Sequence, residues 1–270
     1  MKRTILITGS TDGIGLVAAT QLAEMGHTVL LHGRSPAKLA RVQQALPTAA
    51  GFVADLSRFE DIDAFAAAVR ADVGRLDVLI NNAGVFKGAG RAENGLDLRF
   101  MVNTIAPYLL TRRLLPMLDR AGRIINVSSA AQAPVDLRAL TGQVSLSTNA
   151  GYAQSKLALN MWSADLARRL GERGPVVIAV NPGSMLGTKM VKQAFGVSGA
   201  DINIGGDILV RTGLSDEFAG ASGRYFDNDR GQLAAAHPDM DNTDRAATLT
   251  RAIDAILKQA GISDLPPIQP

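Results

Sequence analysis

Residues 3–15 read Arg-Thr-Ile-Leu-Ile-Thr-Gly-Ser-Thr-Asp-Gly-Ile-Gly, and this segment is the strongest indication of the fold. Its first part, Arg3 to Ile7, is short, apolar and β-branched, which predicts a buried strand. The helix predicted next carries apolar residues at helical spacing and closes at Gly26-His27. A strand, a glycine turn and a helix in this order place a pyrophosphate at a helix N-terminus, where free N–H groups and the helix dipole favour negative charge.

The glycine turn, Thr8 to Gly15, is the first candidate cofactor site. Its glycines are spaced G-x-x-x-G-x-G, which differs from the usual dinucleotide fingerprint G-x-G-x-x-G. A tight turn that needs glycine for a positive φ angle is the alternative interpretation. If the turn holds a pyrophosphate, the contacting residues are Gly9, Ser10, Thr11, Asp12, Gly13, Ile14 and Gly15.

A second candidate site lies in the stretch Asn-Ala-Gly-Tyr-Ala-Gln-Ser-Lys, residues 149–156. Four-residue spacing on a helix puts the Tyr152 phenol and the Lys156 ammonium on one face. A free tyrosine has a pKa of about 10, and a nearby ammonium favours the phenolate and lowers that pKa. The pair is therefore a candidate acid/base for proton transfer with a substrate oxygen. This spacing also arises by chance, so by itself it is weak evidence for an active site. It becomes strong evidence because the chain also carries the glycine turn.

Together these residues resemble the short-chain dehydrogenase/reductase family, and the likeness covers almost the whole chain. The matching motifs occur in family order: the glycine turn, Asp55-Leu56, Asn81-Asn82-Ala83-Gly84, Asn103, Ser129, the Tyr152/Lys156 pair and Asn181-Pro182-Gly183. Within the family, the Gly223-Arg224-Tyr225-Phe226 stretch and the long gap between Ser129 and Tyr152 are most similar to the retinol-dehydrogenase-like branch.

The resemblance implies four catalytic residues: Asn103, Ser129, Tyr152 and Lys156. As hydride arrives at a carbonyl carbon, Tyr152 would donate a proton to the oxygen, and Ser129 would position that oxygen. Ser129 is preferred to Ser128 because the family's serine is the second of such a pair. Lys156 would lower the pKa of Tyr152 and bind the nicotinamide ribose. Asn103 would hold a water that connects Lys156 to solvent; stabilisation of a helix bend is its alternative role.

The choice of nucleotide is predicted from the end of the second strand. NAD-binding folds place an acid there, yet no Asp or Glu lies between Glu24 and Asp55, and Arg34 takes the position. A guanidinium suits a phosphate, and Ser35 adds a hydroxyl, so NADP(H) is expected and NAD(H) is less favoured. Asp12 counts against NADP(H), because an acid in the cofactor turn does not attract a phosphate. The alternative for Arg34 is that it is an ordinary surface arginine. The resemblance adds these cofactor contacts: Asp55, Leu56, Asn82, Ala83, Gly84, Tyr152, Lys156, Pro182, Gly183 and Thr188.

The whole chain reads as alternating strands and helices without a linker or repeat. This pattern predicts an α/β fold: one doubly wound Rossmann domain over residues 1–270, with a parallel seven-stranded sheet in a three-layer α/β/α sandwich. Strands are expected near residues 3–8, 27–32, 51–54, 77–81, 123–128, 175–180 and 223–226. A helix is expected from Pro36 to Leu46, capped by Ser35, and the helix with Tyr152 should end at Gly171.

Two segments are expected to form substrate loops, at about residues 130–150 and 184–210. The gap between Ser129 and Tyr152 exceeds that of ordinary family members, so the insertion around residues 139–143 should form part of the substrate wall. The stretch 185–206 is loop-rich and apolar, which fits a lid over a lipophilic carbonyl or alcohol, although plain packing is the common role of such methionines.

Composition restricts the remaining function classes. The chain has 270 residues, a net charge of +3 and no cysteine, and its three histidines show no ligand spacing, so no metal site is expected. The basic pairs Arg112-Arg113 and Arg168-Arg169 are interpreted as solvated helix faces, and no nucleic-acid partner is expected. No membrane span or signal peptide is evident, which predicts a cytoplasmic protein. A homodimer or homotetramer is compatible with the sequence.

Two functions therefore follow from the sequence. The favoured one is an NADP(H)-dependent oxidoreductase that interconverts a carbonyl and a hydroxyl on a small lipophilic molecule. The other is a non-catalytic NAD(P)-binding sensor or regulator on the same scaffold, because a fold alone does not specify chemistry. Against the sensor, all four catalytic positions are filled.

Overall fold

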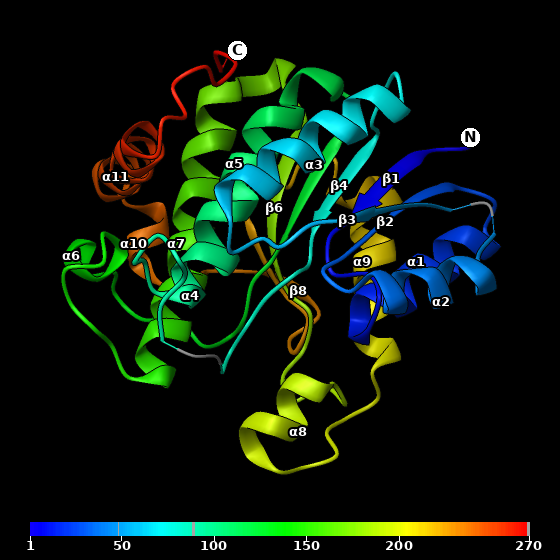
Figure 1. Ribbon diagram of the computed structural model, residues 1–270, viewed down its shortest axis with the longest axis horizontal. Coiled ribbons are helices and arrows are strands. Elements are labelled where there is room, and N and C mark those ends of the chain that lie inside the picture. The colour runs from blue at the N-terminus through cyan, green and yellow to red at the C-terminus, as the bar shows by residue number, and fades with distance from the viewer. Residues whose placement is uncertain (48, 88–89, 269–270) are drawn as a thin grey trace.

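The computed structural model describes residues 1–47, 49–87 and 90–268. Figure 1 shows a central sheet with helices on both faces. The strands of this sheet are β1 (Thr4–Ile7), β2 (Thr28–Gly33), β3 (Ala50–Val53), β4 (Val78–Asn81), β5 (Arg123–Val127), β6 (Val176–Asn181), β7 (Tyr225–Asp227) and β8 (Gln232–Ala234). The α-helices are α1 (Gly13–Glu24), α2 (Pro36–Ala45), α3 (Phe59–Asp72), α4 (Leu98–Phe100), α5 (Ala106–Leu114), α6 (Leu137–Leu140), α7 (Thr148–Leu170), α8 (Lys189–Phe195), α9 (Asn203–Leu214), α10 (Pro238–Asp241) and α11 (Thr243–Gln259).

The strand order is β3-β2-β1-β4-β5-β6-β7-β8. From β1 the chain first adds strands on one side of the sheet, up to β3, and then crosses back to add β4 on the other side of β1. The first seven strands pair in parallel, for example Ile5 with Val29 and with Val78. In such a sheet ligands bind beyond the carboxyl ends of the strands, at the point where the order reverses. The predicted doubly wound parallel sheet is confirmed, and this topology places the glycine turn at that point.

One strand was not predicted. β8 pairs antiparallel with β7, so the sheet has eight strands rather than seven. Gln-Leu-Ala is too short to show an alternating pattern, so no sequence signal marks this strand. Its hydrogen bonds come from pairing with β7.

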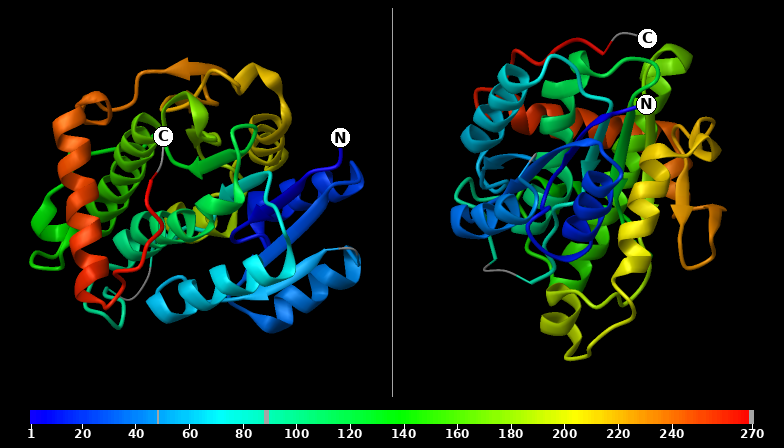
Figure 2. Two further views of the ribbon diagram at one scale, coloured as in Figure 1. Left: turned by 90° about the horizontal axis from the view of Figure 1, so that it is seen from above. Right: turned by 90° about the vertical axis from the view of Figure 1, so that its right-hand side faces the viewer.

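Alternate residues of each strand face two separate apolar cores. On one face, Leu6 and Leu79 pack with α3, α5, α7 and α11. On the other face, Ile5 and Ile80 pack with α1, α2 and α9. Because side chains alternate along a strand, a sheet buried on both faces needs continuous apolar runs such as Ile5-Leu6-Ile7. In the left view of Figure 2, α11 of the first core (orange-red) lies at the opposite side of the molecule from the N-terminal segment that enters β1 (dark blue).

The local helix signals act as predicted. Pro36 stands in the first turn of α2, and the Ser35 hydroxyl accepts a hydrogen bond from the Lys38 amide at 3.4 Å. The helix that carries Tyr152 ends at Leu170, with Gly171 at its C-cap. The start of α2 and the end of α7 are therefore set by these local capping residues.

The prediction that the basic pair on α5 forms a solvated helix face is wrong. Arg112 and Arg113 are 6% and 8% exposed. Arg113 Nε donates to Asp63 on α3 at 2.8 Å, and its Nη2 donates to Asp264 in the C-terminal tail at 2.9 Å. These partners, distant in sequence, let the guanidinium be buried without an unpaired charge. Arg168 on α7 is exposed, as expected.

Candidate active site

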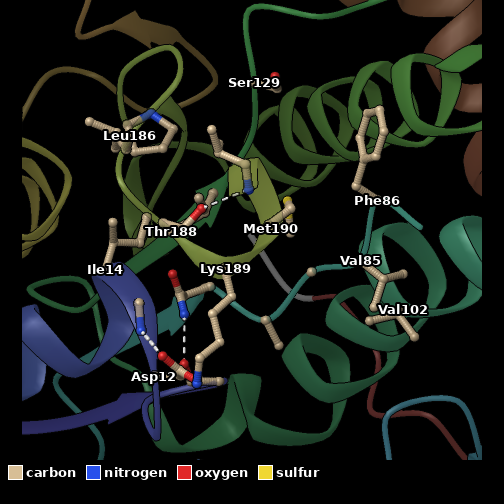
Figure 3. Close-up of a pocket in the computed structure, with 18 of the residues that line it drawn as sticks. Asp12, Ile14, Val85, Phe86, Val102, Ser129, Leu186, Thr188, Lys189 and Met190 are labelled. Carbon is tan, nitrogen blue, oxygen red and sulfur yellow. Dashed lines mark hydrogen bonds and ion pairs between the residues drawn. The ribbon is translucent and has the colours of Figure 1, made fainter. Parts of the chain in front are cut away.

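A cavity of about 890 Å³ lies beyond the carboxyl ends of the central strands. Figure 3 shows side chains from the glycine turn, the segment after β4 and α8 converging on it. The cavity brings together most of the predicted site residues, namely Gly9, Thr11, Asp12, Gly13, Ile14, Arg34, Asp55, Leu56, Asn82, Ala83, Gly84, Ser129, Tyr152, Lys156, Pro182, Gly183 and Thr188. Its lining does not include Ser10, Gly15, Ser35 and Asn103.

The glycine turn needs its glycines for two physical reasons. Gly9 and Gly13 have φ angles of +66° and +62°, which side chains disfavour. A Cβ on Gly9 would lie 2.9 Å from the Ala83 Cα, and a Cβ on Gly15 would overlap the Asn82 amide. The turn is therefore tight, as the alternative interpretation required, and its open side also faces the cavity. Backbone without side chains at this place fits the approach of a dinucleotide.

Asn82 fixes the turn from the neighbouring strand. Its Nδ2 donates to the carbonyl oxygens of Thr8 at 2.9 Å and Gly9 at 3.1 Å. In return, the Thr8 hydroxyl accepts from the backbone amides of Asn82 and Ala83, both at 3.0 Å. The Asn82 side chain therefore acts by holding the turn in shape.

Tyr152 and Lys156 project from α7, whose first turn is capped by Ser147. Lys156 is 4% exposed, and its Nζ donates to the Val127 carbonyl at 2.7 Å. Burial lowers the pKa of Lys156 to about 8, because desolvation disfavours the ammonium. At neutral pH this lysine is still mostly protonated.

The pKa of Tyr152 is raised rather than lowered. Burial is the main cause, and the Ser129 hydroxyl acts in the opposite direction. The sequence predicted that Lys156 would lower this pKa. In the structure its Nζ lies 5.7 Å from the Tyr152 ring centroid and is committed to Val127, so desolvation of the phenol dominates. Tyr152 therefore holds its proton at neutral pH.

The two serines after β5 both line the cavity. Ser129 Oγ accepts from the Ala131 amide at 3.1 Å, and its hydroxyl lies close enough to affect Tyr152. Ser128 is buried, and its Oγ has no hydrogen-bond partner among the described residues. The contact with Tyr152 favours Ser129 as the serine that works with the phenol.

Asn103 lies in a π-helical segment, Met101–Ile105, and is 1% exposed. Its Oδ1 accepts from the Val85 amide at 2.8 Å, and its Nδ2 donates to the Val85 carbonyl at 2.9 Å and to Ser155 Oγ at 3.0 Å. A Cβ on Gly84 would lie 3.3 Å from Asn103 Oδ1 and 3.6 Å from Lys156 Nζ. The asparagine side chain thus ties the segment after β4 to α7 behind the cavity.

A charged cluster lies at the other end of the cavity. Asp12 caps α1 by accepting from the Gly13 amide at 3.0 Å, and its Oδ2 also pairs with Lys38 at 3.1 Å and Lys189 at 2.5 Å. Figure 3 shows Lys189 reaching from α8 to this carboxylate. The hydrogen bonds of these two ammonium groups hold the pKa of Asp12 below its usual value against the opposing effect of burial, the largest single contribution. Arg34 and the Asp55 carboxylate line the same end, so this region carries three cations and two acids, of which Asp12 is paired with two lysines.

Apolar side chains line the region near Tyr152. The Phe86 ring lies 4.9 Å from the Tyr152 ring and 5.5 Å from the Phe195 ring, measured between centroids. Phe86 follows β4, whereas Phe195 ends α8. The remaining apolar lining near these rings comes from Val85, Leu98, Val102, Leu186, Met190 and Val191.

The two predicted substrate loops differ in their contribution to the cavity. Most residues between Ser184 and Phe195, in the first half of the segment expected to form a lid, line the cavity. From the other loop, Ala130 and Ala131 are part of the lining, and residues 134–149 are not. Leu140 is instead fully buried in the apolar core. Of the segment expected to form the substrate wall, Ala130 and Ala131 therefore contact the cavity. The apolar residues of the insertion are buried in the core instead, because removing their apolar surface from water stabilises the fold.

Several residues that build the cavity were missed by sequence reasoning. Lys38 follows Arg34 in the first turn of α2, and its position next to the strand end was an available signal. Lys189 and Phe86 had no such signal, since each acts through a residue far away in sequence. His32 was considered only as a metal ligand, yet its ring accepts a hydrogen bond from the Gly9 amide.

Comparisons with known proteins agree with this geometry. Residues 3–196 match the family model described as short chain dehydrogenase. The chain belongs to the short-chain dehydrogenase/reductase family. It is 31% identical to human retinol dehydrogenase 13 over 83% of this chain and 76% of that protein. It is 32% identical to the short-chain dehydrogenase chyC of Penicillium rubens over 93% of this chain and 96% of that protein.

Among solved structures, a short chain dehydrogenase from Shigella flexneri, complexed with NADP, is similar with a TM-score of 0.67. The two proteins are 28% identical, and the match covers 84% of this chain and 97% of the other. The family and its retinol-dehydrogenase-like branch, predicted from the motifs, are confirmed.

As a member of this family the protein is an NAD(P)-dependent oxidoreductase that acts on CH–OH and C=O groups of small molecules. The non-catalytic alternative is not favoured. Within the described part of the chain, no helix is long and apolar enough to cross a membrane.

Proposed function

We propose that this enzyme uses NADP(H) to interconvert a carbonyl and a hydroxyl on a small lipophilic substrate, with Tyr152 as general acid/base. One observation carries the proposal. A single cavity holds the Tyr152 phenol at its apolar end and Arg34, Lys38 and the glycine turn at its charged end. NADP(H) matches this arrangement, because its added phosphate is on the adenosine ribose, at the opposite end of the molecule from the nicotinamide.

The residues at the charged end fit the phosphates of NADP(H). The amides of the glycine turn and the N-terminus of α1 would hold the pyrophosphate. Arg34 and Lys38 would hold the added phosphate, and Asp55 and Leu56 would contact the adenine. Asp12 no longer counts strongly against this choice, because Lys38 and Lys189 neutralise it. The NADP complex of the Shigella flexneri relative supports the same nucleotide.

The residues at the apolar end fit proton transfer to a substrate oxygen. When bound, the nicotinamide supplies the hydride. Tyr152 enters the reaction protonated, because burial raises its pKa, and so is ready to donate to the oxygen that gains charge. Ser129 would hydrogen-bond that oxygen, and Lys156 would stabilise the phenolate left behind. Asn103 would support this set by fixing Val85 and Ser155.

The substrate region indicates a lipophilic molecule. Phe86, Phe195, Met190 and Val102 offer apolar surface beside Tyr152. We propose that residues 184–210 form the lid of a single domain spanning residues 1–270. The similarity to a retinol dehydrogenase supports this substrate class. Cytoplasmic residence and a homodimeric or homotetrameric assembly stay predictions.

The nucleotide choice is tested by binding. NADPH should bind more tightly than NADH, and Arg34→Ala should reduce that preference by roughly 1–3 kcal/mol, the value of a charge-assisted pair. Arg41→Ala is a matched control, because Arg41 is exposed on α2, the helix that follows Arg34, and does not line the cavity. Tighter binding of NADH by the unaltered protein would refute the NADP(H) assignment.

The proton donor is tested by turnover. Tyr152→Phe should lower kcat by at least about a hundredfold while NADPH affinity changes little, because the ring remains. Tyr108→Phe removes a buried phenol outside the cavity and should keep activity. A panel of aldehydes, ketones and quinones serves as substrate. Near-normal turnover by Tyr152→Phe would show that the Tyr152/Lys156 pair is structural.

A further inference from the structure

His32 sits behind the glycine turn, where β2 ends. It is 3% exposed, and its ring stacks on Phe65 of α3 with centroids 4.6 Å apart. Its Nδ1 accepts a hydrogen bond from the Gly9 amide at 3.0 Å. Its Nε2 lies 3.2 Å from the Ala54 carbonyl oxygen. A single side chain therefore connects β2, the glycine turn and the end of β3.

These contacts define the form of the imidazole. An acceptor at Nδ1 has no proton, so the proton of the neutral ring is on Nε2, where it is donated to Ala54. A protonated ring would present an N–H to the Gly9 N–H and break the contact. Burial lowers the pKa of His32 to about 4, which keeps the ring neutral under ordinary conditions. The charged group that faces it is the Asp55 carboxylate after β3, while the turn after β1 presents the Gly9 backbone and α3 presents Phe65.

The contact controls one peptide unit of the cofactor turn. The Thr8–Gly9 peptide has its carbonyl held by Asn82 Nδ2 at 2.9 Å and its amide held by His32 Nδ1 at 3.0 Å. A peptide held at both ends cannot rotate, and Gly9 keeps its φ angle of +66°. The backbone of β2 adds to this hold, because the Ser10 amide donates to the His32 carbonyl at 2.9 Å.

We propose that His32 is a positioning residue that holds the cofactor turn in its binding geometry by accepting a hydrogen bond from the Gly9 amide. The inference rests on the dinucleotide site proposed above. A turn ordered before binding spares the cofactor the entropic cost of ordering it, so the benefit appears as affinity. His32 does this without touching the reacting atoms.

Two substitutions separate the two hydrogen bonds of the ring. His32→Asn places an oxygen at the position of Nδ1 and keeps an acceptor for Gly9. His32→Gln places an amide nitrogen at the reach of Nε2 and keeps a donor for Ala54. His32→Leu removes both. Dissociation constants for NADPH and NADH, kcat at saturating NADPH, and melting temperature are measured for each at pH 7.

We expect NADPH to bind His32→Asn within about threefold of the unaltered protein, and to bind His32→Gln and His32→Leu roughly tenfold or more weakly. Their kcat should fall by less than their affinity. A role in stability alone would lower the melting temperatures and leave the dissociation constants equal. Equal NADPH affinity of the Asn and Gln variants would overturn the proposal. If the unaltered protein binds neither nucleotide, the proposed function falls with it.

A measurement on the unaltered protein covers the case in which variants do not fold. Nitrogen NMR of the labelled imidazole should show His32 with its proton on Nε2 and a bare Nδ1 at pH 7. A proton on Nδ1 would exclude the bond from Gly9 and overturn the proposal directly.

Discussion

Carbonyl reduction by this enzyme should lose rate as Lys156 loses its proton. Burial lowers the pKa of that lysine from 10.5 to about 8, a shift worth roughly 3 kcal/mol of unfavourable ammonium desolvation. Because the folded-state pKa is lowered, the ammonium is present below pH 8 and is lost as pH rises above it. The protonated fraction falls from about nine-tenths at pH 7 to about one-tenth at pH 9.

If the ammonium is needed to stabilise the Tyr152 phenolate, kcat/KM for a carbonyl substrate should fall roughly tenfold between pH 7 and pH 9. Tyr152 itself does not titrate there, because its pKa is raised and the phenol stays protonated over this range. The chain also contains no cysteine. A variant at position 156 is needed to assign the step to the lysine rather than to the N-terminal amine.

The assay is NADPH consumption, followed by absorbance at saturating NADPH, from pH 6 to pH 10. Lys156→Arg provides the control, since a guanidinium stays charged over this range. Its kcat/KM should be lower but free of the step. A flat profile for the unaltered enzyme, or the same step in Lys156→Arg, would refute this role for the ammonium.

Three further outcomes are expected. Asp12→Asn keeps the α1 cap and removes a negative charge beside two lysines, so NADPH should bind roughly two- to tenfold more tightly, and weaker binding would contradict this. Leu140→Ala leaves a cavity at a fully buried position, so the free energy of unfolding measured in urea should fall by about 2–5 kcal/mol while the substrate ranking stays the same. Phe195 is 53% exposed, so Phe195→Ala should change the substrate ranking with little loss of stability. The pKa of His32 is lowered to about 4 in the folded protein, so as the pH falls below about 6.5 the unfolded chain binds a proton before the folded chain does. The free energy of unfolding should therefore drop by about 3 kcal/mol between pH 6.5 and pH 4. The drop should be smaller in His32→Asn, which lacks the imidazole.

The substrate loops illustrate why sequence length alone is a weak guide to a site. The insertion after Ser129 was expected at the substrate, because extra loop residues often carry specificity. Its apolar residues Ala139 and Leu140 instead fill the core, and Arg91 donates to its Gly142 carbonyl at 2.7 Å. Nothing local in the sequence shows which surface an apolar insertion will bury.

The parallel sheet, the glycine turn and the position of the Tyr152/Lys156 pair could all be predicted from the sequence. Each of these depends on local physics: β-branched apolar runs form buried strands, glycine permits positive φ, and four-residue spacing aligns Tyr152 with Lys156 on one helix face. The family motifs then added Ser129 and Asn103, which no local rule selects.

The pKa values of these groups depend on the folded environment and could not be predicted from the sequence. Desolvation depends on every neighbour at once, so the raised pKa of Tyr152 and the lowered pKa of Lys156 could not be obtained from their spacing. The same holds for partners separated by long stretches of chain, such as Asp12 with Lys189. His32 beneath the glycine turn is of this kind, because an imidazole becomes a fixed acceptor only when three elements close around it.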